Sequence, residues 1–370
     1  MREGWTYKKL GEVCESDLGK TLNSSKDTGE MRPYLCAINI LWDKIDFTTL
    51  KQTRFEESEL ERYTVRKGDL LICEGGEIGR AAIWDKDYSI QYQNALHRVR
   101  FTDGVAPRFC LYFFMHLKKS GILDGRYGKG VTIKHLVKSS LMSIPIPVAP
   151  IENQLSIVAE LDKINELMSL KKAQLSDLDS LAQSIFYDMF GDPIENEKEW
   201  EVKRLGEVCT IIAGGDKPKD ISESPNGDYI YPVIANGEGM KGILGYSNKY
   251  RISNPSVTIG ARGASIGNCR IVKENFTPVI RLITITPEEN LEVTYLYFYA
   301  KQIRYNSNGA GQAQLTVPNI ESEIIPIPPL SLQQEFAKRI ELIEQQKAQI
   351  SSTIKDLETL LASRMQYWFD

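Results

Sequence analysis

The stretch that decides the fold runs from Pro150 to Gly191 and reads PIENQLSIVAELDKINELMSLKKAQLSDLDSLAQSIFYDMFG. Alternating steps of four and three residues from Ile157 to Met189 land on apolar side chains, with Lys171 as the exception. This heptad pattern is typical of a coiled-coil helix, and Pro150 marks its start. At about 1.5 Å per residue, such a helix spans roughly 60 Å. One compact domain does not need that length, so we interpret the helix as a spacer.

A second copy of this stretch runs from Pro329 to Asp370, at a constant offset of 179, and reads PLSLQQEFAKRIELIEQQKAQISSTIKDLETLLASRMQYWFD. Its seam is interrupted by Lys347 and Arg364, whose stems can lie along the seam with the charge in water. We expect the two helices to pair antiparallel, although each could also be an ordinary bundle helix on its own domain. The predicted helix-pair interface consists of the apolar seam positions Ile157, Leu161, Ile164, Met168, Leu175, Leu178, Ile185, Phe336, Ile340, Ile343, Ile350, Ile354, Leu357 and Leu361.

The repeat extends well beyond the helices. The matching segments, in chain order, are WTYKKLGEVC at 5–14 and WEVKRLGEVC at 200–209, then 68–83 and 256–271, the aromatic runs 111–114 and 296–299, and VTI at 131–133 with LTV at 315–317. The offset falls from 195 through 188 and 185 to 184 and never rises. A duplicated module with shortened loops explains this pattern.

Each module is predicted to be mixed α/β. Short apolar runs favour strands, namely Tyr34–Ile40, Leu70–Cys73, Ile280–Ile285 and Ile324–Ile327. The aromatic runs favour one helix that packs on the sheet with its rings in the core. The predicted fold class is therefore α+β, with two tandem mixed α/β modules separated by two long antiparallel helices in a pseudo-twofold repeat. The expected boundaries are 1–149, 150–191, 192–328 and 329–370, and the two termini should lie near each other.

Composition narrows the class of protein. The 370 residues are 42% hydrophobic, enough for real cores. The net charge is −4, but the acidity sits in residues 151–199, which carry 11 acidic and 4 basic side chains. Neutral to basic modules permit DNA binding. No apolar run suits a membrane span or a secretion signal, and the six cysteines show no CxxC spacing. We therefore expect a cytoplasmic protein with reduced thiols and no disulfide or metal site.

Catalytic motifs are weak. Gly19-Lys20-Thr21 ends like a phosphate-binding loop, but the glycine required five positions earlier is Cys14. The three histidines show no metal spacing, and the sequence has no glycine fingerprint for S-adenosylmethionine. A repeated module without a repeated catalytic group indicates binding rather than chemistry.

Two modules on a rigid spacer suit a DNA duplex with a site in two parts. Because the modules differ in their loops, the two half-sites should differ in sequence. Phosphates call for Lys, Arg and backbone amides, and base edges call for side chains that make paired hydrogen bonds. On this loop chemistry, the predicted DNA-binding residues are Lys20, Glu74, Arg80, Arg126, Lys129, Thr132, Lys134, Lys217, Lys219, Arg262, Asn268, Asn308, Gln312 and Gln314.

The order of these motifs resembles the specificity subunit of type I restriction-modification systems, over essentially the whole chain. The motifs are the Leu-Gly-Glu-Val module starts, the Gly-Asp-x-Leu-Ile-x-x-x-Gly-x-Ile-Gly segment at 68–79, the Ile-Pro-Ile-Pro runs at 144–147 and 325–328, and the Phe-Gly-Asp-Pro join at 190–193. The chain departs from the family pattern at Val148-Ala149-Pro150 and Gln333-Gln334, which affects only the helix starts.

The resemblance implies two target-recognition domains, each reading one half of an asymmetric DNA site, and conserved helices that set the spacer and bind two modification subunits. Those subunits would carry S-adenosylmethionine-dependent adenine methylation. Added restriction subunits would carry the ATP- and Mg-dependent translocation and cleavage. The chain itself would then be non-catalytic and hold no cofactor or metal.

Two other classes of function stay open from the sequence. One is a DNA methyltransferase or nuclease with a divergent site. The other is a scaffold whose modules bind proteins instead of DNA.

Overall fold

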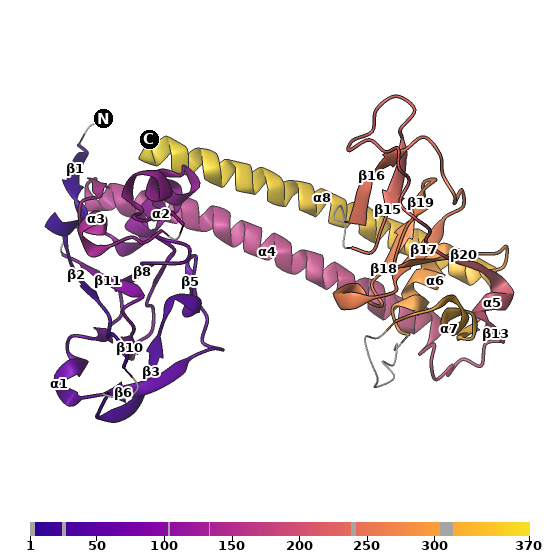
Figure 1. The fold of residues 1–370 in the computed structure, drawn as a ribbon, viewed down its shortest axis with the longest axis horizontal. Helices are drawn as coiled ribbons and strands as arrows, with labels where there is room; N and C mark the ends of the chain where they lie inside the picture. The colour runs from indigo at the N-terminus through magenta and orange to yellow at the C-terminus, as the bar shows by residue number, and fades with distance from the viewer. Residues whose placement is uncertain (1–3, 24–26, 103, 133, 238–241, 304–313) are drawn as a thin grey trace. The chain divides into compact units, whose positions relative to one another are not determined.

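A computed structural model describes residues 4–23, 27–102, 104–132, 134–237, 242–303 and 314–370. The chain divides into two compact units, Met1–Lys171 with Thr353–Asp370, and Lys172–Ser352. Unit 1 contains module 1, the residues before α4, and unit 2 contains module 2, the residues between the long helices. The predicted long helices are α4 (Ile151–Phe190) and α8 (Leu330–Phe369), and each runs through both units (Figure 1). Both begin directly after the proline that marked their start. No helix of the described ranges combines the length and apolar character that crossing a membrane requires.

In unit 1, the end of α8 packs along the beginning of α4. Ile157 and Leu161 of α4 are buried in one core with Met365 and Phe369 of α8. The Glu160 carboxylate accepts hydrogen bonds from the Arg364 guanidinium and, at 3.0 Å, from the Trp368 indole. The two chain directions are therefore opposed.

In unit 2, the end of α4 packs along the beginning of α8. Phe190 and Phe186 of α4 meet Phe336 of α8 at ring-centroid distances of 5.2 and 5.7 Å. Asp179 and Lys347 form an ion pair of 2.7 Å. This is the predicted antiparallel arrangement. The seam residues are buried or half-buried in the structure, with Met168, Leu175, Ile185, Leu357 and Leu361 in the half-buried group.

Module 1 is built on two sheets with strand orders β2-β11-β8-β9 and β6-β3-β10-β7, and on the small pairs β1-β12 and β4-β5. Its strands are β1 (Thr6–Lys9), β2 (Cys14–Leu18), β3 (Glu30–Leu35), β4 (Ile40–Leu41), β5 (Lys44–Ile45), β6 (Lys51–Phe55), β7 (Thr64–Val65), β8 (Leu70–Cys73), β9 (Ala81–Ile83), β10 (Ile90–Tyr92), β11 (Leu96–Phe101) and β12 (Pro145–Val148). Its helices are α1 (Glu57–Leu60), α2 (Pro107–Lys119) and α3 (Lys138–Met142), with a π-helical turn at Leu123–Tyr127.

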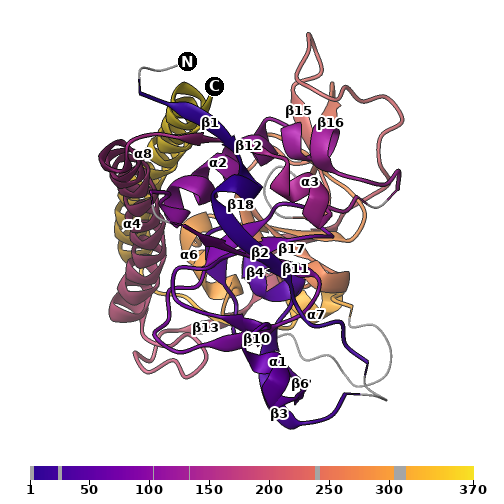
Figure 2. The ribbon, with the colours of Figure 1, turned by 90° about the vertical axis from the view of Figure 1, so that its left-hand side faces the viewer.

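The β2-β11-β8-β9 sheet is buried on both faces. Leu70 and Ile72 of β8 belong to a core with α2, α4 and the end of α8, whereas Leu71 and Cys73 belong to a core with the second sheet. Figure 2 shows α2 between this sheet and the long helices. Burial on both faces explains why β8 is a continuous apolar run and not an alternating one.

Module 2 repeats this construction with the sheets β14-β20-β17-β18, β16-β15-β19 and β13-β21. Its strands are β13 (Val202–Arg204), β14 (Cys209–Ala213), β15 (Tyr231–Ile234), β16 (Ile243–Ser247), β17 (Ser256–Gly260), β18 (Cys269–Val272), β19 (Thr277–Pro278), β20 (Leu282–Pro287) and β21 (Ile324–Pro326). Its helices are α5 (Leu205–Val208), α6 (Val293–Ala300) and α7 (Val317–Glu321). The predicted aromatic helices are α2 and α6, and most of their rings are buried as expected.

A buried glutamine ties each module to the start of its long helix. The Gln154 side chain accepts from the Ala106 N–H at 2.9 Å and donates to the carbonyls of Gly104 and Ala149 at 2.8 and 2.7 Å. Gln333 repeats this pattern in unit 2, and neither side chain is exposed. These hydrogen bonds satisfy an N–H at the start of α2 or α6 that has no partner within the helix.

Two predicted strands have different bounds in the structure. The strand expected at Tyr34–Ile40 ends at Leu35, and a 3-10 turn follows at 37–39. The strand ends early because the Asn39 side chain accepts a hydrogen bond from the Cys36 N–H at 2.9 Å, which competes with strand pairing. The strand expected from Ile280 begins at Leu282, because Arg281 has a φ of 69° and cannot continue an extended chain.

The repeat alignment predicted before the long helices is wrong by a few residues. Val131 is 99% exposed, whereas Leu315 is 8% exposed, so they are not equivalent. The buried Leu136 matches Leu315 instead. Each donates its N–H to the residue that follows β8 or β17, at 2.7 and 2.9 Å. The offset is therefore already 179 here, and 146–147 pair with β1 as 325–326 pair with β13. Chance similarity inside a loop of changed length caused the error.

We expect Gln333→Ala to lower the free energy of unfolding of unit 2 by about 3 kcal/mol, because it leaves one buried N–H and two carbonyls without a partner. Denaturant unfolding followed by hydrogen exchange of α6 peptides measures this. The neighbouring exposed Gln334→Ala is the matched control and should change stability by less than about 0.5 kcal/mol. Equal effects of the two variants would contradict the role of the buried amide.

Candidate nucleic-acid interface

Most of the predicted DNA contacts of module 1 lie where the β8–β9 loop meets the segment before α3. The Glu74 N–H donates to the Ala95 carbonyl at 2.9 Å, and the Glu74 carbonyl accepts from the Leu136 N–H at 2.7 Å. Lys129 and His135 exchange two backbone hydrogen bonds of 2.8 Å, which close the segment between them. We call residues 74–80, 128–132 and 134–136 the module 1 junction. Its backbone is fixed from both sides.

A buried histidine on β11 forms a hydrogen bond to the backbone of this junction. The His97 Nε2 lies 2.7 Å from the Leu136 carbonyl, so the neutral ring donates there with Nε2 protonated. Burial lowers the pKa of His97 to about 4. Among the described residues, nothing bonds its buried Nδ1. The ring is therefore a neutral structural donor at physiological pH.

Some cations of the module 1 junction are held by the module itself. The Arg80 guanidinium donates to the Ala37 carbonyl at 2.9 Å and lies 3.4 Å from Glu77. The Lys134 ammonium donates to the Asp124 carbonyl at 2.5 Å. The remaining predicted contacts of this region are exposed, namely Arg126, Lys129 and Thr132.

Module 2 has an equivalent junction at residues 261–268 and 314–316. The Ala261 N–H donates to the Arg281 carbonyl at 2.8 Å, and the Ala261 carbonyl accepts from the Leu315 N–H at 2.9 Å. Arg262 and Gln314 form a backbone bridge, and the Arg262 guanidinium donates to the Gln314 side-chain carbonyl. The predicted residues Arg262 and Gln314 are thus brought together.

A cavity of about 420 Å³ opens beside the module 2 junction. Its polar lining includes Asn236, Asn268, Arg270 and Lys301. Asn236 also donates to the Arg262 carbonyl at 2.7 Å, which links the cavity to the junction. Burial raises the pKa of the Cys269 thiol in this lining to about 12, so the thiol stays protonated and is a poor nucleophile. The cavity offers hydrogen-bond donors and acceptors.

The two junctions share a backbone but differ in side chains. The hydrogen bonds place Glu74 opposite Ala261 in the repeat and His135 opposite Gln314. Gly75 then corresponds to Arg262, and a Cβ on Gly75 would lie 3.3 Å from the His135 ring. The same place in each module therefore presents different hydrogen-bonding groups.

Lys20 does not belong to this surface. It is 5% exposed, and its ammonium lies 2.7 Å from Glu59, 3.4 Å from Asp27 and 2.9 Å from the Arg54 carbonyl. We therefore assign Lys20 to the fold of module 1, which corrects the expectation of a DNA contact. The sequence could not reveal the two carboxylates that take up its charge.

Lys217 and Lys219 lie exposed on the loop after β14. The Arg251 guanidinium approaches the same loop, because a Cβ on Gly215 would lie 2.4 Å from its Nη1. Arg251 was missed from the sequence because it comes from a distant segment. Asn308 and Gln312 lie outside the described residues.

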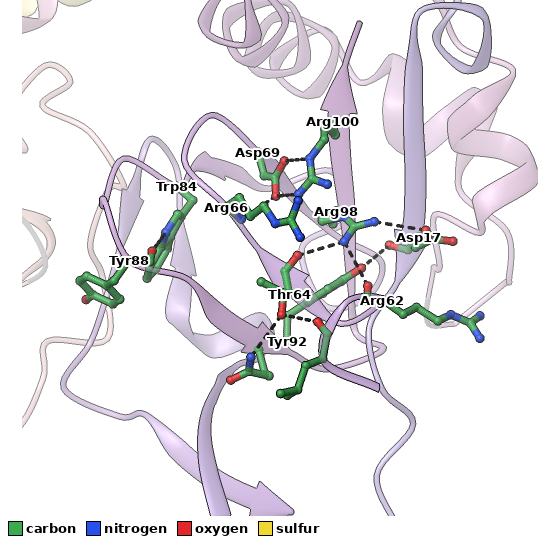
Figure 3. A network of polar contacts seen from close by, with 12 residues as sticks. Asp17, Arg62, Thr64, Arg66, Asp69, Trp84, Tyr88, Tyr92, Arg98 and Arg100 are labelled. Carbon is green, nitrogen blue, oxygen red and sulfur yellow. Dashed lines mark hydrogen bonds and ion pairs between the residues drawn. The ribbon is translucent and has the colours of Figure 1, made fainter. Parts of the chain in front are cut away.

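Module 1 also contains a polar network around two arginines of β11 that sequence reasoning missed (Figure 3). Arg100 makes two bonds of 2.7 Å to the buried Asp69, which also accepts from the Arg66 N–H at 2.7 Å. Arg98 bonds Asp17 at 3.2 Å and two backbone carbonyls at 2.9 and 3.0 Å. Both arginines lie on β11, the strand that carries His97. They stabilise the module and are not free for phosphates.

Comparison with known proteins gives consistent results. The family described as "Type I restriction modification DNA specificity domain" matches residues 2–179 and 197–359. Two proteins of Mycoplasma pneumoniae with "type I specificity subunit" in their names are each 30% identical to this chain. One match covers 56% of this chain and 57% of the relative, and the other covers 69% and 80%. The chain thus spans just over half the length of the first of these relatives.

A longer match is the "Type I restriction enzyme MjaIX specificity subunit" of Methanocaldococcus jannaschii, 25% identical over 90% of this chain and 85% of the relative. Among solved structures, the S subunit from M. genitalium has a TM-score of 0.60 at 17% identity and covers 99% of this chain and 96% of its own. A structure from a study of type I R-M complex assembly has a TM-score of 0.64 at 19% identity, covering 100% and 98%. These structures share the fold.

The fold defines a class of proteins in which two tandem α/β modules pack on a pair of long helices. The chain belongs to the type I restriction-modification DNA specificity family, and the match covers both modules. This membership confirms the resemblance seen in the sequence.

We expect module 1 to lose stability as the pH falls from about 6.5 to 4. In this window the unfolded chain protonates His97 but the folded chain does not, so the unfolded state binds more protons. The loss should approach about 3 kcal/mol at the acid end. His97→Ile, which copies Ile283 of module 2, removes this dependence. Hydrogen exchange of β8 and β11, compared between variant and parent at each pH, measures it, with β17 and β20 as internal control. Parallel pH profiles of the two proteins would contradict the assignment.

Proposed function

We propose that each module reads one half of an asymmetric DNA site in two parts. The observation that carries the proposal is the pair of junctions, which have matching backbone hydrogen bonds and different side chains. Matching scaffolds suit the same groove of a duplex, and different side chains suit different bases. Module 1 offers Glu74 and His135 at this place, whereas module 2 offers Arg262 and Gln314.

We further propose that α4 and α8 set the separation of the two half-sites. Each helix has 40 residues, about 60 Å in length. After allowance for the width of the modules, the half-site centres would be on the order of one turn of DNA apart. The ion pairs and aromatic contacts within each end of the helix pair support this proposal.

The partners proposed for the chain are double-stranded DNA, two modification subunits and the restriction subunits. The modification subunits would bind S-adenosylmethionine and methylate adenine. The restriction subunits would bind ATP and Mg and cleave. All would act with this chain in the cytoplasm. Their docking surface on α4 would include leucines that are exposed although apolar, namely Leu155, Leu167, Leu170 and Leu181. Val158, near the start of the same helix, is buried in the unit 1 core and is not part of this surface.

Selection from random duplexes tests the DNA-reading proposal. We expect the complete complex to enrich an asymmetric, gapped consensus, and exchange of residues 1–149 with those of a relative to change one half only. Sequencing methylated adenines in the host provides a second measurement. Enrichment of no consensus would favour a protein-binding scaffold. Product formed by the isolated chain from labelled S-adenosylmethionine and DNA, or cleavage with Mg²⁺, would favour a divergent enzyme.

The docking surface has its own test. We expect Leu170→Asp to weaken assembly with the modification subunits at least about tenfold, because a buried apolar contact worth about 2 kcal/mol is lost and a charge is introduced. Ser169→Asp, at an exposed neighbouring position, is the matched control. Sedimentation of the mixed subunits measures assembly. Unchanged assembly of Leu170→Asp would exclude this flank.

A further inference from the structure

We propose that Glu74 is the specificity-determining residue of module 1 and that its carboxylate accepts a hydrogen bond from the exocyclic amino group of a base in the major groove. Cytosine N4 and adenine N6 both present this group. The inference rests on the proposed function and names the base chemistry that one junction reads.

The backbone at Glu74 is held in a defined place. Glu74 follows β8 directly, and its N–H and carbonyl are both bonded, at 2.9 and 2.7 Å, to two different segments. Two residues on, a Cβ on Gly76 would meet nothing within 4 Å, and Gly76 has a φ of 71°. The loop therefore leaves open space at Gly76, two residues after Glu74, where a base edge can approach the backbone closely.

The carboxylate has no partner of its own. Glu74 is half-buried, yet its side chain makes no hydrogen bond or ion pair with any residue in the described parts of the chain. Burial raises the pKa of this carboxyl, and its electrostatic interaction with His135 opposes that shift. The carboxylate oxygens therefore keep their hydrogen-bonding capacity for a ligand, and partial burial has already weakened their hydration. An amino group from a ligand would use this capacity.

The surroundings favour DNA as the source of that donor. Arg126 and Lys129 lie exposed around the junction, and Lys134 is half-exposed beside them. Such cations suit DNA phosphates, whereas a carboxylate repels phosphates. A carboxylate among these cations is compatible with DNA only where it meets a base, because bases supply donors.

A carboxylate is also selective in what it rejects. Ionised Glu74 only accepts hydrogen bonds, so it repels the O6 of guanine and the O4 of thymine at the same position. Module 2 has Ala261 at the equivalent place and the Arg262 guanidinium next to it. A change at Glu74 should therefore alter one position in one half-site only.

The first experiment compares enriched DNA sites for the complex carrying wild-type chain, Glu74→Gln or Gln314→Ala. Glutamine has the same shape but both donates and accepts. We expect Glu74→Gln to relax discrimination at a single position about 5- to 100-fold, and to admit guanine or thymine there. Gln314→Ala, the matched control, should leave that half-site unchanged. An unchanged consensus with Glu74→Gln would overturn the inference while the two-part site stands. Absence of any consensus with wild-type chain would instead overturn the proposed function.

The second experiment separates the two bases. At the position that Glu74→Gln relaxes, the base is replaced by its analogue without the amino group, which is purine for adenine or 2-pyrimidinone for cytosine. We expect the analogue to weaken wild-type binding about as much as the variant weakens binding to normal DNA. Combined, the two changes should weaken binding no further, because they remove the same bond. Additive losses would show that Glu74 and the amino group do not touch, and would overturn the inference.

Discussion

Neither module completes its core with its own residues. In unit 1, Phe369 from the end of α8 packs against Phe109 and Phe113 of α2, with ring centroids 5.3 and 5.6 Å apart. In unit 2, Phe190 from the end of α4 packs against Tyr295 of α6 at 4.7 Å. Burial of each of these rings contributes on the order of 2 to 3 kcal/mol to the free energy of unfolding. Folding of each module is therefore coupled to helix pairing, and the long helices are part of both cores.

The parts of the fold that the sequence predicts are those set by local periodicity. The heptads of α4 and α8, the doubly buried run of β8 and the aromatic helices α2 and α6 all follow from spacing along the chain. The parts that it misses depend on partners far away. Lys20 looks like a surface cation until Glu59 and Asp27 fold around it, and Val131 matches Leu315 by residue type although their exposures are opposite.

The sequence predicts which loops form the candidate site, but it does not predict which residues of the two modules occupy equivalent positions. Sequence comparison placed Glu74 against Arg262, whereas the hydrogen bonds of Leu136 and Leu315 place Glu74 against Ala261. One residue of difference decides which groups face the ligand, so the repeat alone cannot show what each junction reads. The strand residue that packs beneath each junction also differs between the modules. In β11 it is His97, a buried hydrogen-bond donor, whereas in β20 the equivalent residue is Ile283. Only the backbone hydrogen bonds are common to both.

The two residues that interrupt the apolar seam have a role of their own. An uninterrupted heptad seam allows two helices to slip by seven residues, about 10 Å, with little loss of apolar contact. Such a slip corresponds to roughly three base pairs of DNA. Lys347 meets Asp179 in unit 2, and Arg364 meets Glu160 in unit 1. A slipped pair would lose both inter-helix ion pairs, although Lys347 would keep its contact with Glu344 on α8. The basic interruptions therefore favour the register that the proposed half-site spacing needs, because only this register forms both inter-helix ion pairs.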